Sequence, residues 1–214
     1  MPYSKEHKSK SKDRILKSAT ELFFRYGFDK VSISQIMKLA RMTHGAFYAH
    51  FESKEALFNA SFLETLRRSR AARLTKGPFS IKHLTALVTD YLNLRDQKKA
   101  DEPGPESILF NEIGSDNFEI KKLYEKSYTS LKETLESRIT ALSRLNKLPF
   151  SADSETVAEK SRAILASLVG AVAIAKTLPH EEEQRNILLT AQKQIFSILG
   201  VNEHDLHDLS DQAR

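Results

Sequence analysis

The stretch that decides the fold is VSISQIMKLARMTHGAFYAHFESKE, residues 31–55. Apolar residues recur at spacings of three and four from Ile33 to Ala40, which predicts one buried stripe along a short helix. Ser32 stands where its hydroxyl can accept from the free backbone N–H groups of the first turn. Arg41 and the residue after it interrupt the apolar spacing, so we expect the helix to end there.

A second short helix is predicted to begin at Thr43, which can cap it. Phe47 and Phe51 lie one turn apart and form its inner face. The opposite face carries His44, Gly45 and Tyr48. Ser53 can cap a third helix, with Glu55 placed favourably in its first turn. Two short helices joined by a tight turn, the second with a small and polar outer face, are typical of a helix-turn-helix.

This region resembles the DNA-binding domain of the TetR family of bacterial regulators, and the likeness is specific for residues 10–60. The matching residues are Ile15, Leu16, Ala19, Leu22, Phe23, Gly27, Ser32, Ile36, Ala40, Thr43, Gly45, Phe47, Tyr48, His50, Phe51, Ser53, Lys54 and Glu55. The string THGAFYAHFESKEAL is similar to a subgroup whose recognition helix reads much like THGGFYAHF. The resemblance implies an all-α chain of about nine helices, with a helix-turn-helix domain followed by a helical ligand-binding and dimerisation domain.

The sequence departs from the family at Arg41, because the family usually has glycine in the inter-helix turn. If this position needs a positive φ, arginine costs about 1 kcal/mol or more. Alternatively, the turn is slightly re-shaped and Arg41 lies near a phosphate.

Charge is distributed unevenly along the 214 residues. Residues 1–76 carry 16 lysines and arginines against 7 acidic residues, while the remainder carries 17 against 21, which gives the net charge of +5. A basic domain joined to an acidic one fits a phosphate-facing head and a partner domain away from DNA, although a solvated basic face would look the same. The chain has no cysteine, lacks a long apolar run and begins with a polar segment, so we expect a cytoplasmic protein without disulfides or thiolate metal sites.

The chain divides into five predicted regions. A disordered basic arm (1–11) precedes the helix-turn-helix domain (12–52), and a connecting helix (53–76) leads to the Gly77-Pro78 boundary. A ligand-binding and dimerisation domain (77–199) and a frayed tail (200–214) complete it.

The predicted DNA-binding residues are Ser32, Ser34, Gln35, Thr43, His44, Gly45, Ala46, Tyr48, His50 and Lys54. A helix in the major groove needs small residues where its backbone meets the bases, which Gly45 and Ala46 supply. His44 can bond a base edge, although it can equally be a plain exposed histidine. The resemblance assigns phosphate contacts to the residues matching Thr43, Tyr48, His50 and Lys54.

Two apolar, small-residue helices near the end of the chain favour a four-helix dimer interface, with packing inside one subunit as the alternative. The candidate interface residues are Ala163, Ala166, Ser167, Gly170, Ile174, Leu188 and Ile195. Such a homodimer would hold two recognition helices about 34 Å apart on a palindromic operator in double-stranded DNA.

The resemblance implies a small-molecule effector that releases DNA by favouring another spacing of the two heads. Aromatic and amide residues interleave at the candidate effector positions Phe110, Asn111, Asn117, Phe118, Tyr124 and Tyr128, which are equally compatible with core or surface roles. Sensing through a thiol is excluded because the segment EPGPESILF has no cysteine.

A helical enzyme and a non-specific DNA-packaging protein are the alternatives. The sequence offers one His/Asp cluster for catalysis or metal binding, at His204, Asp205, His207 and Asp208, in the expected mobile tail. A packaging protein would explain the basic half but not a large acidic second domain. We therefore expect a transcriptional regulator with no catalytic residue, metal or cofactor, most simply a repressor.

Overall fold

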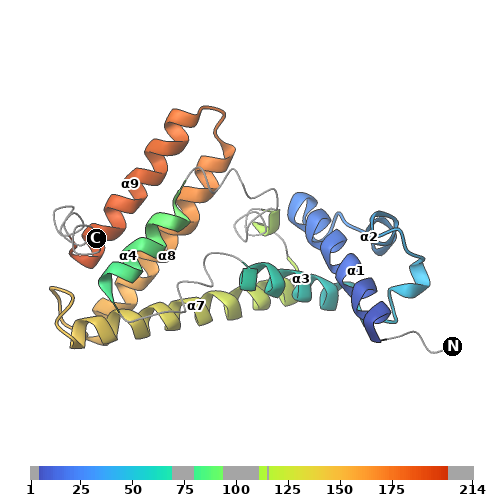
Figure 1. The fold of residues 1–214 in the computed structure, drawn as a ribbon, viewed down its shortest axis with the longest axis horizontal. Coiled ribbons are helices and arrows are strands. Elements are labelled where there is room, and N and C mark those ends of the chain that lie inside the picture. The colour runs from blue at the N-terminus through green and yellow to red at the C-terminus, as the bar shows by residue number, and fades with distance from the viewer. Residues whose placement is uncertain (1–4, 69–79, 94–110, 115, 202–214) are drawn as a thin grey trace. The chain divides into compact units, whose positions relative to one another are not determined.

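The computed structural model describes residues 5–68, 80–93, 111–114 and 116–201, and all regular structure in these ranges is helical. The described residues divide into two compact units. The first unit holds those up to 69 together with those between 101 and 125, and the second holds those between 70 and 100 and from 126 onward. Figure 1 shows the helices and their labels.

The first unit is a small helical head built from α1 (Lys5–Tyr26), α2 (Ile33–Leu39), the 3-10 helix η1 (His44–Ala46) and α3 (Lys54–Arg68). Its core contains an aromatic cluster in which Phe23, Phe28 and Phe58 lie with ring centroids 5.1–5.8 Å apart. Phe47 and Phe51 are buried in the same core, as the helical spacing predicted. This shared core fixes the recognition segment against α1 and α3.

Helix α1 begins earlier than the sequence indicated. Residues 5–11 form its first turns, so the expectation of a disordered arm over residues 1–11 is wrong for these seven residues. A run of polar and basic side chains is compatible with an exposed helix face, and apolar spacing is informative only once the buried stripe begins at Ile15.

A later segment of the chain also belongs to the head. The side-chain amide of Asn111 donates to the Phe24 carbonyl over 2.5 Å, and the Phe28 N–H donates to Glu112 Oε1 over 2.7 Å. Ile120, at the start of α7 (Phe118–Arg144), is buried in the head core. The head is therefore not the contiguous block 12–52 that the sequence predicted, because residues near 111–125 return to it.

The second unit contains α4 (Ile81–Tyr91), the remainder of α7, α8 (Ser154–Thr177) and α9 (Glu181–Leu199). Helices α8 and α9 pack side by side as an antiparallel pair (Figure 1). Gln192 Nε2 on α9 donates to Thr89 Oγ1 on α4 over 2.9 Å. Ser80 and Asp153 cap α4 and α8 by accepting from backbone N–H groups three residues on.

Candidate nucleic-acid interface

The turn between α2 and the recognition segment is a Schellman motif. The Met42 N–H donates to the Met37 carbonyl over 3.0 Å, and the Arg41 N–H donates to the Lys38 carbonyl over 3.1 Å. Arg41 takes a left-handed conformation with φ of 54°. Of the two alternatives for this turn, the structure has the positive φ, which costs an arginine about 1–2 kcal/mol.

Arg14 ties this turn to α1. Arg14 Nη2 donates to the Ala40 carbonyl over 2.5 Å, at the C-terminal end of α2. A guanidinium at a helix C-terminus is favoured by the helix dipole and satisfies a carbonyl that has no partner within the helix. Arg14 therefore positions α2, a role that sequence periodicity did not reveal.

The start of α2 is closed by a capping box. The Gln35 N–H donates to Ser32 Oγ over 3.2 Å, and the Ser32 N–H donates to Gln35 Oε1 over 2.7 Å. The Ser32 hydroxyl also lies 2.8 Å from Gln35 Oε1. The cap at Ser32 is confirmed, and both side chains predicted to contact DNA are already bonded to each other. Ser34, in the first turn of α2, is exposed.

The recognition segment is shorter and tighter than the α-helix expected from Thr43. Only η1 is regular helix, and its bonds run from Ala46 N–H to the Thr43 carbonyl and from Phe47 N–H to the His44 carbonyl. The Thr43 side chain makes no capping hydrogen bond, so that prediction is wrong. The extended Thr43 backbone leaves its exposed hydroxyl available to an external group.

One face of this segment is exposed as predicted. Tyr48 is 61% exposed, and its ring lies 6.0 Å from that of exposed His44. Gly45 is also exposed, and a Cβ built there would meet no atom within 4 Å. Packing within the described protein therefore does not require a glycine at Gly45. Half-buried Ala46 packs against the head core.

Lys54 occupies a more enclosed position than its predicted role suggested. Its Nζ lies 4.1 Å from the centre of the Phe28 ring. Burial lowers the pKa of Lys54, while the carboxylates of Asp29, Glu55 and Glu112 oppose that shift. Lys54 thus contributes to the stability of the head as well as to its surface charge.

His50 lies beside the early turns of α1. Burial lowers the pKa of His50, and the positive charges of Lys8 and Lys12 lower it further. Lys12 Nζ also lies 5.7 Å from the centre of the Phe51 ring. The helical start of α1 therefore brings two lysines to the recognition segment, where the sequence predicted a loose arm.

The predicted effector residues that the structure describes differ in their surroundings. Asn111 bonds the end of α1, and Asn117 Oδ1 accepts from the Ile120 N–H at the start of α7. Phe118 is 65% exposed under the Lys122 ammonium, and Tyr128 is exposed. The Tyr124 ring packs edge-on against Phe62, and burial raises the pKa of its hydroxyl. Phe110 lies outside the described residues.

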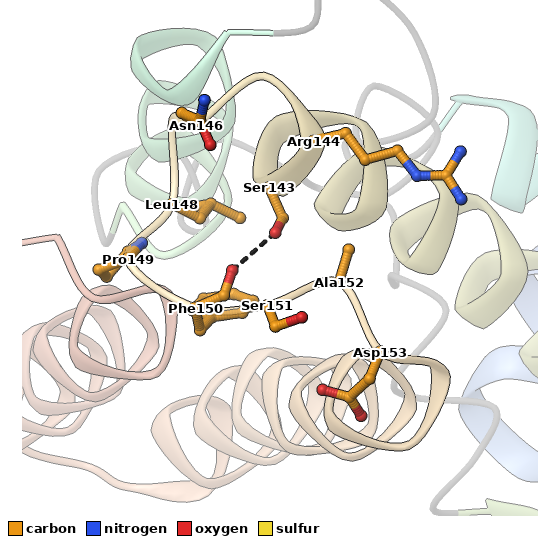
Figure 2. A pocket seen from close by; sticks show the side chains of 9 residues that line it. All are labelled: Ser143, Arg144, Asn146, Leu148, Pro149, Phe150, Ser151, Ala152 and Asp153. Atoms are coloured by element: carbon orange, nitrogen blue, oxygen red, sulfur yellow. Dashed lines mark hydrogen bonds between the residues drawn. The ribbon is translucent and has the colours of Figure 1, made fainter.

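A cavity of about 710 Å³ lies at the turn between α7 and α8. Figure 2 shows the side chains that line it. Inside it the Ser143 hydroxyl donates to the Phe150 carbonyl over 2.6 Å. Its lining residues are Ser143, Arg144, Asn146, Leu148, Pro149, Phe150, Ser151, Ala152 and Asp153. None of these was predicted to bind the effector.

The predicted dimer residues fall into two groups. Ala166 and Ile174 are exposed on α8, and Ala163, Ser167 and Gly170 are half-buried there. Leu188 and Ile195 on α9 are instead buried in the protomer core, in one cluster with residues of α4, α7 and α8. These two side chains have no surface to offer a second copy. Leu189, the neighbour of Leu188, is 46% exposed.

The described residues contain no group of three or more His, Cys, Asp or Glu side chains that could hold a metal ion. His204, Asp205, His207 and Asp208 lie outside the described range. Among the described helices, none combines the length and the apolar character that a membrane span needs.

A trihelical head with an exposed recognition segment, joined to a second helical unit, defines a helix-turn-helix DNA-binding protein. Residues 15–61 match the family described as bacterial regulatory proteins, tetR family. The chain is 32% identical over 158 residues to the uncharacterized HTH-type transcriptional regulator YdgC of Bacillus subtilis, covering 70% of this chain and 74% of that protein. The chain belongs to the TetR family and is a transcriptional regulator rather than an enzyme.

Two further comparisons agree. An HTH-type transcriptional repressor of Mycobacterium tuberculosis is 31% identical over 94 residues, which is 44% of this chain and 47% of that protein. The crystal structure of Escherichia coli NemR in its reduced form aligns with a TM-score of 0.73 at 18% identity, covering 91% of this chain and 99% of that one. This structural likeness confirms the all-α fold with its N-terminal helix-turn-helix.

Proposed function

We propose that this regulator is a repressor that binds a palindromic operator as a homodimer and leaves it when a small molecule binds the second unit. The observation that carries the DNA-binding part is the exposed face of His44, Gly45 and Tyr48 on a segment held by the buried rings of Phe47 and Phe51. One of the similar proteins is a transcriptional repressor, which supports repression rather than activation. The proposed site of action is the cytoplasm, where the operator is located.

We assign base recognition to His44. The absence of a side chain at Gly45 allows the backbone to approach the base edges closely. The half-buried Ala46 offers its methyl group to a thymine. The sequence THGAFYAH supports membership of the subgroup whose recognition helix has a sequence similar to THGGFYAHF.

Phosphate contacts are proposed for Thr43, Tyr48, His50 and Lys54. The free hydroxyl of Thr43 and the exposed phenol of Tyr48 support the first two. Ser32, Ser34 and Gln35 at the start of α2 remain weaker candidates, since the capping box already engages two of them. Lys54 is a poor single probe because its removal also uncovers the Phe28 ring.

The dimer is proposed to form through the exposed faces of α8 and α9. Ala166 and Ile174 on α8 and Leu189 on α9 supply apolar surface, and the small residues Ala163, Ser167 and Gly170 permit close helix approach. Effector binding to the second unit would shift the spacing of the two heads only by binding one arrangement better than the other.

The test is binding of the purified protein to a set of palindromic duplexes, beginning with those beside its own gene, followed by fluorescence anisotropy. We expect one palindrome to bind at least a thousandfold more tightly than random duplex, with a steep salt dependence. His44→Ala should change the preferred bases, and analytical ultracentrifugation should give a dimer. Equal affinity for every duplex would instead favour a packaging protein.

A further inference from the structure

The turn residue Arg41 is an exception among the helix ends of this protein. Within the described ranges, positive φ angles occur at Gly27, Gly114, Gly200, Asn146 and Arg41. Glycine tolerates this region because it has no Cβ, and asparagine because its short polar side chain can hydrogen-bond locally. Arginine has neither advantage, and its Cβ crowds the following carbonyl oxygen. The chain thus places a tolerant residue at each of these positions except the one between α2 and the recognition segment.

Asn146 shows that the exception is not imposed by the motif. At the end of α7, the Asn146 N–H donates to the Ser143 carbonyl and the Lys147 N–H donates to the Leu142 carbonyl, both over 2.9 Å. These bonds repeat the Schellman pattern found at Arg41, with asparagine in the left-handed position. The same turn geometry therefore forms with a residue better suited to it.

No contact inside the described part of the protein offsets the strain at Arg41. Its side chain is exposed and makes no hydrogen bond or ion pair with any described residue. The turn is closed by backbone bonds and by the packing of Met42 against the head core, neither of which needs an arginine side chain. Backbone strain that persists without an internal benefit points to a function outside the fold.

The position of Arg41 suggests what that function is. In a docked helix-turn-helix the first helix crosses the DNA backbone and the start of the second enters the groove, so the turn between them borders the phosphates. Arg41 stands two residues before Thr43, and exposed Lys38 precedes it by three residues. A guanidinium can bind one phosphate through two parallel N–H groups.

We propose that Arg41 is a DNA-backbone contact, and that the head retains a strained turn in order to hold this guanidinium beside a phosphate. The inference rests on the proposed DNA-binding function. It assigns Arg41 a contact that does not depend on base sequence, unlike that of His44. Glycine at this position would give a more stable head that binds DNA less tightly.

The experiment compares Arg41→Gly, Arg41→Asn and Arg41→Lys, with Asn146→Gly as the matched control at the same kind of turn in the other unit. Arg41→Gly should raise the melting temperature by about 2–4 °C. It should weaken binding by about tenfold for each subunit near 0.1 M salt and reduce the salt slope by about one for each subunit, on operator and random duplex alike. Arg41→Asn should behave similarly, and Arg41→Lys should keep most of the salt slope.

Asn146→Gly should leave affinity and salt slope unchanged. Wild-type affinity and an unaltered slope in Arg41→Gly would overturn the assignment, whatever the change in melting temperature. A wild-type protein that binds all duplexes equally, but whose slope still falls in Arg41→Gly, would support the phosphate contact while overturning the sequence-specific function. A wild-type protein that binds no duplex would overturn both.

Discussion

Glu112 provides the sharpest test of how the head is held together. It is 8% exposed, and its Oε1 accepts from the Phe28 N–H over 2.7 Å at the corner between α1 and α2. Glu112→Ala removes a hydrogen bond to a charged acceptor and leaves a buried N–H without a partner, which costs about 2 kcal/mol of unfolding free energy. Glu112→Gln keeps an acceptor oxygen and should lose about half as much.

The assay is thermal and urea unfolding followed by circular dichroism at 222 nm, with operator affinity measured on the same samples. A loss of about 2 kcal/mol corresponds to about 4–8 °C for a chain of this length. Glu119→Ala is the control, because Glu119 is an exposed glutamate of α7 that pairs with Lys122 over 3.5 Å and should change stability by less than about 1 kcal/mol. If Glu112→Ala were as stable as Glu119→Ala, the bond to the α1–α2 corner would not contribute as argued.

Three further outcomes are expected. Gly45→Ala should leave the melting temperature unchanged or slightly higher, because no atom lies within 4 Å of the new methyl. Fluorescence anisotropy should show weaker operator binding. Unchanged affinity would contradict a close approach of the Gly45 backbone to the bases. The pKa of His50 is lowered in the free protein and a phosphate would raise it, so operator affinity should increase as pH falls from about 7.5 to 6. His50→Gln should reduce that increase. Leu189→Asp should yield monomers by ultracentrifugation with weakened operator binding. Leu145→Asp, at an exposed leucine directly after the end of α7, should remain dimeric.

Features that depend on neighbouring residues could be predicted from the sequence. The cap at Ser32 and the cap at Ser53, which accepts from the Ala56 N–H over 3.1 Å, each involve residues three apart. The burial of Phe47 and Phe51 follows from helical spacing. The Thr43 cap failed for a related reason, since the tight 3-10 turn that follows does not bring an N–H to the hydroxyl.

Long-range bonds could not be predicted because nothing local encodes them. The bonds from Arg14 to Ala40, from Phe28 to Glu112 and from Asn111 to Phe24 span 26, 84 and 87 residues. Each needs the path of the whole chain to bring donor and acceptor together. The packing of Leu188 could not be predicted either. Apolar spacing predicts that Leu188 is buried, but not whether it packs within its own subunit or against a second copy.

The sequence by itself determined an all-helical chain, a helix-turn-helix between residues 31 and 55, and a family, because periodicity, caps and residue types are local properties. Only the tertiary structure decided that Arg41 adopts a positive φ, that the lysines of early α1 reach His50, and that residues near 112 complete the head. These features arise from packing between segments distant in sequence, where the geometry is set by the shared core rather than by any short stretch of residues.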